Sequence, residues 1–180
     1  DAIANVTLGQ GPGLFPSVGF VAEGGVYRQR QNLDSIRSKG VEFDASIDLS
    51  REIVLNLGYA FVDARVRGSV VALMLDGLRP AQVPKHAGRV GASWKVDGFH
   101  GDATLRYIGK QSEDDANIRS LGDALTADIG LGYDLSERLR IDLRGENIFN
   151  ARVEAAISST GIIERANPRT LWLGVRYNFD

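Results

Sequence analysis

The chain has 180 residues, a net charge of −2 and no cysteine. The lack of cysteine excludes disulfides, thiolate metal ligands and cysteine nucleophiles within it, and the well-mixed acids and bases argue against nucleic acid as a partner. No apolar run approaches the ~20 residues that a membrane-spanning helix needs, whereas a spanning β-strand needs only about 9–11 residues with one apolar face. The length suits one domain. Because the chain begins with Asp1 rather than Met, we expect a processed chain or a piece of a longer one.

Apolar and less apolar residues alternate with a period of two in segment after segment. This pattern is typical of half-buried β-strands, because successive side chains leave opposite faces of the backbone. The last segment is representative: Leu171, Leu173 and Val175 alternate with Gly174 and Arg176. We count about eight such strands and no convincing helix. In chain order, the predicted strands lie in residues 3–8, 41–49, 52–61, 90–96, 103–109, 124–135, 139–149 and 169–180.

The connections between these strands alternate strictly between short polar turns and long stretches rich in Gly, Pro, Asp and Asn. In an up-and-down sheet this alternation places every tight turn at one end and every long loop at the other, which is the asymmetry of outer-membrane barrels. We therefore predict an all-β, antiparallel, up-and-down transmembrane β-barrel segment over residues 1–180, with short periplasmic turns and long extracellular loops. The short turns are at 50–51, 97–98 and 136–137, and the long stretches are at 9–25, 68–84, 112–121 and 150–168.

One predicted strand carries five charged residues on a single face, and the C-terminal strand adds an arginine on its less apolar face. A soluble sandwich could point such a face at solvent. Facing lipid, each Arg or Lys near the membrane midplane would cost roughly 2–4 kcal/mol, so a barrel must turn this face toward its lumen. The predicted lumen-facing residues are Arg138, Arg140, Asp142, Arg144, Glu146 and Arg176.

The aromatic residues of the apolar face favour a membrane barrel over a soluble domain. They gather near the two ends of the strands with aliphatic residues between them, like the aromatic girdles at the two membrane interfaces. Phe43, which lies between the two bands, is the exception. The predicted band at the short-turn end consists of Trp94, Phe99, Tyr133, Tyr177 and Phe179. The predicted band at the loop end consists of Tyr59, Phe61, Tyr107 and Phe149.

Several motifs, taken in order, cover essentially the whole chain. They are DAIANVTLGQGPG (1–13), RQRQNLDSIRSKGVEFDA (28–45), VPKHAGRVGASW (83–94), and ENIFN (146–150) followed by NPRTLWLGVRYNF (167–179). Together they resemble the C-terminal part of a TonB-dependent outer-membrane receptor. The resemblance implies a Gram-negative outer-membrane location and active uptake of siderophores, haem, vitamins or glycans, energised through periplasmic TonB. Such barrels have about 22 strands around a plug, so the resemblance implies that the plug, the TonB box and the earlier strands lie outside these residues.

The sequence offers no recognisable catalytic or metal site, and we predict neither an enzyme nor a cofactor. His86 and His100 are the only histidines, and no Asp or Glu stands at ligand spacing from either of them, so we expect structural or solvated roles. The glycines of residues 9–13 surround Pro12 and lack a strand-to-helix context, which favours a loop over a phosphate-binding site. The sequence shows no recognisable Ser-His-Asp arrangement.

Ligand contacts are expected in the long loops, because a substrate of a plugged barrel arrives from outside. Two loops carry side chains able to hydrogen-bond a polar ligand or to pair with a charged one. The predicted ligand-contacting residues are Glu113, Asp114, Asp115, Asn117, Arg119, Glu164, Arg165, Asn167 and Arg169. The expected partners are outer-membrane lipid, the remaining strands and plug of the receptor, TonB through the missing N-terminal region, and a small-molecule or metal-chelate ligand.

The sequence is also consistent with two other interpretations of the fold and function. Because an eight-stranded barrel can close on itself, the chain could be a complete outer-membrane protein that acts as an adhesin or a membrane-embedded enzyme. A soluble lipocalin-like protein would instead place Leu139, Ile141 and Leu143 around an internal apolar cavity.

Overall fold

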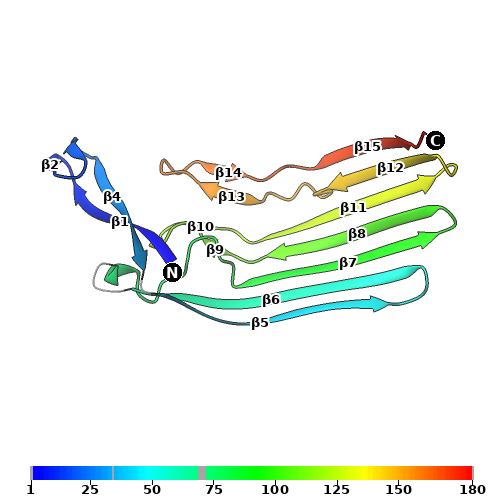
Figure 1. Cartoon of the computed structure of the whole chain (residues 1–180), viewed down its shortest axis with the longest axis horizontal. Coiled ribbons are helices and arrows are strands. Elements are labelled where there is room, and N and C mark those ends of the chain that lie inside the picture. Colours follow the sequence, from blue (N-terminus) through cyan, green and yellow to red (C-terminus); the bar gives the residue numbers. More distant parts are fainter. Residues whose placement is uncertain (1, 34, 69–71, 180) are drawn as a thin grey trace.

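The computed structural model describes residues 2–33, 35–68 and 72–179. Its main feature is a seven-stranded antiparallel sheet in the order β15-β12-β11-β8-β7-β6-β5, so each strand pairs with its nearest long neighbours along the chain (Figure 1). The antiparallel all-β prediction is confirmed. The strands of this sheet are β5 (Ser35–Asp48), β6 (Ile53–Arg67), β7 (His86–Val96), β8 (Phe99–Ile108), β11 (Ala124–Asp134), β12 (Leu139–Glu146) and β15 (Thr170–Tyr177).

Four small strand pairs and one 3-10 turn accompany the sheet. The largest pair, β1 with β4, projects beyond the loop end of the sheet (Figure 1). Among the described residues, no helix is long and apolar enough to cross a membrane. The pairs are β1 (Ala2–Gln10) with β4 (Val26–Leu33), β2 (Gly13–Phe15) with β3 (Gly19–Val21), β9 (Gln111–Ser112) with β10 (Ser120–Leu121), and β13 (Glu154–Ile157) with β14 (Ile163–Arg165); the 3-10 turn is η1 (Leu73–Leu75).

The three tight turns of the main sheet lie together at one end, and its long connections lie at the other (Figure 1). The turn between β7 and β8 shows why this end is compact: Asp97 and Gly98 have φ of 45° and 81°, a backbone that suits the right-handed twist of a two-residue hairpin. In the β11–β12 turn, the Ser136 hydroxyl accepts hydrogen bonds from the backbone N–H of Arg138 and Leu139. The predicted alternation of short and long connections is confirmed.

The structure corrects the predicted strand ends on the N-terminal side. β4 was not predicted, because its sequence VYRQRQNL is polar at successive positions and lacks the alternation of a half-buried strand. β5 begins at Ser35 and β6 reaches Arg67, so both extend further toward the loops than predicted. These extensions pair with one another without a register shift. The β5 extension is polar, whereas the β6 extension also buries Ala64 and Val66, so backbone hydrogen bonds and local packing together support the two strand ends.

β12 begins at Leu139, as predicted, but ends three residues earlier than predicted. It ends at Glu146 because Asn147 has a left-handed backbone (φ 48°), and the side-chain amide of Asn147 exchanges hydrogen bonds with the backbone N–H and C=O of Ala151. Phe149 therefore lies past the strand. At the other end, Arg138 belongs to the tight turn rather than to β12.

The register gives the sheet one apolar and one polar face. In one row across the sheet, Trp94, Gly101, Leu131, Leu143 and Leu173 are successive Cα partners. The adjacent row consists of Ser93, Asp102, Gly130, Arg144 and Trp172, again in successive pairing. Since residues paired directly across antiparallel strands share a face, the two rows lie on opposite faces.

The apolar face is not covered by any part of the chain that the structure describes. Leu173 is 75% exposed and Leu143 is 47% exposed, and such a continuous exposed apolar surface marks contact with another molecule or with a membrane. The small core lies elsewhere, where Val66 packs with Ala72 and Leu75 at the loop end.

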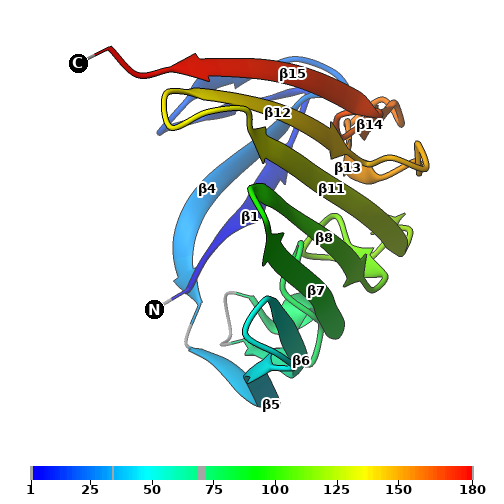
Figure 2. The same cartoon turned by 90° about the vertical axis from the view of Figure 1, so that its right-hand side faces the viewer.

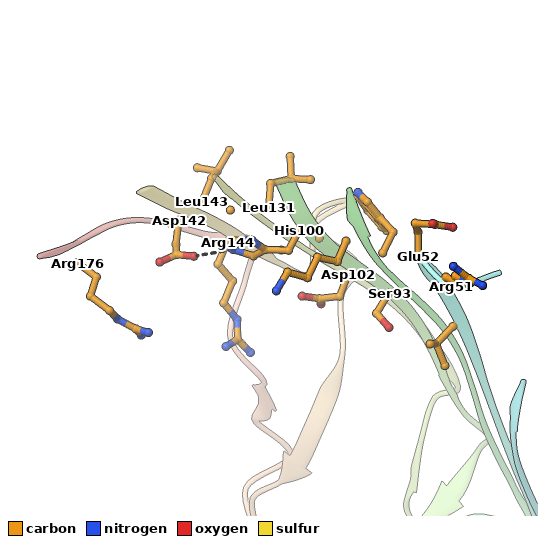
Figure 3. A pocket seen from close by; sticks show the side chains of 16 residues that line it. Arg51, Glu52, Ser93, His100, Asp102, Leu131, Asp142, Leu143, Arg144 and Arg176 are labelled. Carbon is orange, nitrogen blue, oxygen red and sulfur yellow. Dashed lines mark ion pairs between the residues drawn. The ribbon is translucent and has the colours of Figure 1, made fainter. Parts of the chain in front are cut away.

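The main sheet is curved and open (Figure 2). Its described edge strands, β5 and β15, do not pair with each other, so these strands form an arc rather than a closed barrel. The charged side chains of Asp102, Arg144 and Arg176 project to one side of the sheet, and the side chains of Leu131 and Leu143 project to the other (Figure 3).

Candidate functional site

A hollow of about 610 Å³ lies on the polar face, near the tight-turn end of the sheet. Residues from six strands and one turn line it (Figure 3). Three of its residues, Asp142, Arg144 and Arg176, belong to the predicted lumen-facing set. The ionisable residues that line the hollow are Arg51, Glu52, Lys95, His100, Asp102, Asp142, Arg144 and Arg176.

His100 links three strands at the edge of this hollow. Its ring extends from β8 across Gly132 of β11 and brings Nε2 to 3.6 Å from Asp142 Oδ1 on β12. The other ring nitrogen, Nδ1, lies 3.2 Å from Arg140 Nη2. A Cβ atom at Gly132 would overlap the imidazole, so the glycine is what allows the ring to reach β12. Arg140 also donates from Nε to Asp134 Oδ1 at 2.8 Å.

The charges in the hollow suit non-covalent recognition. Arg144 Nε is 3.2 Å from Glu146 Oε1, and the guanidinium groups of Arg144 and Arg176 both project from the polar face (Figure 3). Arginine can bind carboxylate or phosphate groups in a bidentate manner. Among the described residues, no group of three or more His, Cys, Asp or Glu side chains is arranged to hold a metal ion. The hollow can thus bind and orient charged groups.

At the loop end, Asp114 organises residues 112–121. Asp114 Oδ1 accepts a hydrogen bond from the backbone N–H of Ile118 at 3.1 Å, and Oδ2 accepts from the backbone N–H of Arg119 at 2.8 Å. The Arg119 guanidinium also donates to Oδ2 at 3.2 Å. Burial raises the pKa of Asp114, but the two backbone hydrogen bonds and the Arg119 side chain lower it more, so the pKa lies below its ordinary value.

The same segment links three long connections. Arg119 Nη1 donates to the backbone oxygens of Ile157 and Ser158, at 3.1 and 2.8 Å. The Asn117 side-chain amide exchanges hydrogen bonds with the backbone N–H and C=O of Arg79, at 2.9 and 2.8 Å. Glu113 accepts a hydrogen bond from Gln82. The predicted residues Glu113, Asn117 and Arg119 thus bond to other loops, whereas the Asp114 carboxylate bonds within its own segment. Asp115 is half-buried beside them.

The second predicted loop cluster has a different character. Glu164 and Arg165 lie on β14, and Asn167 and Arg169 lie between β14 and β15. All four residues are exposed. These four residues belong to the connection between β12 and β15, residues 147–169. Among the described residues of the other predicted loop, only Arg119 has a side chain that bonds directly to this connection, through the backbone oxygens of Ile157 and Ser158.

Aromatic side chains lie at both ends of the apolar face. At the tight-turn end, the rings of Phe99 and Tyr133 lie 4.2 Å apart, and those of Tyr177 and Phe179 lie 4.7 Å apart. Trp94 lies against Gly101 in the same region.

At the loop end, the Tyr59 hydroxyl lies 2.8 Å from His86 Nδ1, and the His86 ring is 5.3 Å from that of Phe61. Tyr107 pairs with Gly88 on the neighbouring strand. Phe43, which the pattern leaves between the bands, is the Cα partner of Tyr59. Phe149 is 76% exposed in the segment after β12.

Comparison with known families decides the identity of this sheet. Residues 1–148 match the family described as TonB dependent receptor-like, beta-barrel. The chain belongs to this TonB-dependent receptor family. The predicted resemblance is therefore confirmed, and so is the predicted location, because these receptors are proteins of the Gram-negative outer membrane.

The curated proteins that the chain matches are also named as receptors or transporters. The chain is 28% identical over 151 residues to the ferrioxamine receptor of Yersinia enterocolitica, a match that covers 80% of the chain and 21% of that receptor. It is 32% identical over 118 residues to the ferrichrome outer membrane transporter/phage receptor of Escherichia coli K12, covering 63% of the chain and 15% of the relative. The chain spans about a fifth of the length of the curated relatives it matches.

Solved receptor structures show the same fold. The ferric yersiniabactin uptake receptor FyuA of Yersinia pestis superimposes with a TM-score of 0.76 at 18% identity, over 84% of this chain and 25% of that one. The ferric citrate transporter FecA in its unliganded form gives a TM-score of 0.68 at 20% identity, over 83% of this chain and 24% of that one.

Sequence reasoning missed much of the hollow in this receptor barrel. Lys95, His100 and Asp102 lie on the same face as Asp142. The predicted strands had no register, and the strand predicted over 103–109 excluded His100 and Asp102, which β8 includes. His100 was expected to have a structural or solvated role. The alternation within β7 and β8 was the available signal. Arg51 and Glu52 lie in the tight turn before β6, where side chains have no fixed alternation, although the strand predicted over 52–61 had included Glu52.

Proposed function

We propose that this chain forms the C-terminal section of the barrel of a receptor that imports a ferric siderophore or similar metal chelate, with energy supplied through TonB. The observation that carries the proposal is the sheet itself, which combines an uncovered apolar face, a charged opposite face and long loops at one end. The relatives are named as receptors for ferrioxamine, ferrichrome and metal-pseudopaline. These names favour metal chelates over the glycans and vitamins that the family also takes up.

The proposed domain assignment follows from the share of the relatives' length that this chain covers. Because the chain spans about a fifth of its curated relatives, the plug and the earlier strands belong to other parts of the receptor. In this arrangement the polar face lines the lumen, so Arg138, Arg140, Asp142, Arg144, Glu146 and Arg176 face inward. Lipid then covers the opposite face, with the two aromatic groups at the membrane interfaces.

The proposed route of the ligand begins at the loops. The exposed side chains of Glu164, Arg165, Asn167 and Arg169 make first contact, because charge-assisted hydrogen bonds to polar or anionic groups of a chelate are available there. Glu113, Asp114, Asp115, Asn117 and Arg119 contribute mainly by holding the neighbouring loops in place, since most of their bonds are internal. Further in, Arg144 and Arg176 offer a second charged surface. No bond in the ligand needs to be made or broken, so no catalysis is proposed.

The test is uptake by whole cells that carry the full-length receptor and lack other receptors for the same ligands. Radiolabelled iron is supplied as ferrioxamine or as ferrichrome, with and without a proton ionophore. We expect accumulation of at least one chelate only when the receptor is present and the proton gradient is intact. Binding without accumulation, or accumulation that persists without the gradient, would overturn the proposal.

A further inference from the structure

Another hollow lies on the polar face, in the half of the sheet that is nearer to the long loops. Its volume is about 450 Å³, and residues of β5, β6, β7 and β8 line it. We call it the loop-side hollow, to distinguish it from the hollow that contains His100. The polar-face residues that line it are Glu42, Asp44, Gly58, Ala60, Ala87, Arg89, Arg106 and Ile108.

The loop-side hollow lies directly beneath the long connections. Glu42, Ala60, Ala87 and Ile108 are successive Cα partners and form one row across the four strands. Ala87 and Ile108 are the last register pair of β7 and β8 before residues 109–123. Among the rows that cross all four strands, this row is the nearest to the loops. A solute that enters from the loop end therefore reaches it before the rows nearer to the tight turns.

Glu42 carries the one uncompensated charge of this hollow. Arg89 Nη2 lies 2.9 Å from Asp44 Oδ1, and Arg106 forms an ion pair with Asp128 on β11. Among the described residues that line the hollow, only Glu42 is charged and has no ion-pair partner. Its side chain is exposed. The hollow thus offers a free carboxylate to a cation that arrives from the loop end.

The surface next to Glu42 is shallow and apolar. Ala60 is the direct partner of Glu42, and Ala87 is the partner of Ala60. Because both side chains are single methyl groups, they leave space above the backbone, and Ile108, which is 43% exposed, lies at the end of the row. A carboxylate beside an apolar trough is complementary to an alkylammonium group, whose methylene groups cover apolar surface while its charged end pairs with the acid.

We propose that the loop-side hollow binds an ammonium group at the end of a methylene chain of the imported chelate, and that Glu42 selects for it. The ammonium donates hydrogen bonds to the Glu42 carboxylate, and the methylene groups lie over Ala60 and Ala87. Arg165 and Arg169 in the loops stay available to the oxygen atoms of the same ligand. The inference rests on the proposed function and adds a substrate class to it: metal chelates that bear a primary amine.

The test compares two ferric chelates that differ in one group, using the purified full-length receptor. One is ferrioxamine B, which has a terminal primary amine, and the other is the same chelate after acetylation of that amine, which removes the positive charge. Glu42→Gln removes the carboxylate charge with little change of shape, and Glu42→Asp keeps it. Glu137→Gln, in the tight turn at the opposite end of the sheet, is the matched control. Affinities are measured by titration at low and at high salt.

The wild type and Glu137→Gln should bind the amine-bearing chelate about fivefold more tightly than the acetylated one, which is the effect of about one exposed ion pair. High salt should reduce this preference. Glu42→Gln should bind both chelates with the affinity that the wild type has for the acetylated one, whereas Glu42→Asp should keep a preference for the amine. Equal affinities of the wild type for the two chelates would overturn the inference, as would a preference that survives in Glu42→Gln.

Uptake of radiolabelled iron, measured in parallel, separates this inference from the proposed function. A wild type that accumulates either chelate only with an intact proton gradient, but binds both equally well, would contradict the role of Glu42 and leave the proposed function intact. If no chelate accumulates in a gradient-dependent manner, the proposed function itself is wrong.

Discussion

Arg89 of β7 extends across Gly58 of β6 to reach Asp44 of β5, with Nη2 and Oδ1 2.9 Å apart. A Cβ atom at Gly58 would lie 2.8 Å from Arg89 Nε and 2.9 Å from Asp44 Oδ1. His100 crosses Gly132 to approach Asp142 in the same manner. On the polar face, glycine on a middle strand thus lets ionisable side chains two strands apart approach each other, which brings together strands that share no backbone hydrogen bonds.

Replacing Gly58 should cost little, and replacing Gly40 should cost much more. The atoms that a Gly58→Ala methyl group meets are the ends of flexible, largely exposed side chains, and an exposed ion pair is worth about 0–1 kcal/mol. A Gly40→Ala methyl group would overlap the backbone oxygen of Phe61, which cannot move without disturbing the β5–β6 pairing, so we expect a loss of about 1–3 kcal/mol. Guanidinium unfolding of the full-length receptor in detergent measures both. Equal losses would contradict this account of Gly40.

The two tryptophans of the chain should report opposite faces of the sheet. Trp94 lies in the apolar row, whereas Trp172 pairs with Arg144 in the polar row. In the full-length receptor reconstituted with brominated phospholipid, Trp94→Phe should reduce the fluorescence that the lipid quenches. Trp172→Phe should leave that quenched component unchanged. The reverse result would mean that the face assigned to lipid is the lumen face.

Arg119 and Arg165 should affect the receptor in different ways. Arg119→Ala removes the donors to Ile157 and Ser158 and should expose the 147–169 connection to limited proteolysis. Arg165→Ala removes an exposed side chain and should leave the proteolysis pattern unchanged while weakening binding of the imported chelate several-fold. Chelate affinity is measured by titration of the purified receptor, with Ser136→Ala in the opposite tight turn as the control. An Arg165 variant with unaltered affinity would remove this side chain from the ligand site.

The loop that contains Asp114 should loosen in acid. Because the pKa of Asp114 in the folded chain is below its ordinary value of 3.8, ionised Asp114 stabilises the loop above pH 3.8, and this contribution is lost as the pH falls toward the lowered pKa. A nitroxide attached through Ile118→Cys, at a residue that is 84% exposed, should become more mobile over that range. In an Asp114→Asn background the label should be mobile at neutral pH, with little further change in acid. A pH response that survives this substitution would exclude Asp114 as its source.

The sequence by itself determined which residues share a face within each strand and which end of the sheet holds the tight turns. Both follow from local rules. The alternation of side chains along Leu171, Leu173 and Val175 is a property of any pleated strand, and turn lengths are visible directly in the chain. The same rules placed Asp142, Arg144 and Arg176 on one face, and the structure brings all three to the same hollow.

Only the tertiary structure decided which residues of different strands meet. His100 and Asp142 are 42 positions apart, and their approach depends on the register of β8, β11 and β12 and on the space above Gly132. The contact of Lys85 with Phe61 and the bonds from Arg119 to the 147–169 connection likewise join distant segments. A strand pattern with a period of two is unchanged when its neighbour slides by two residues. Register is therefore set by the pairing of whole strands and by their turns, which is information that no single segment contains.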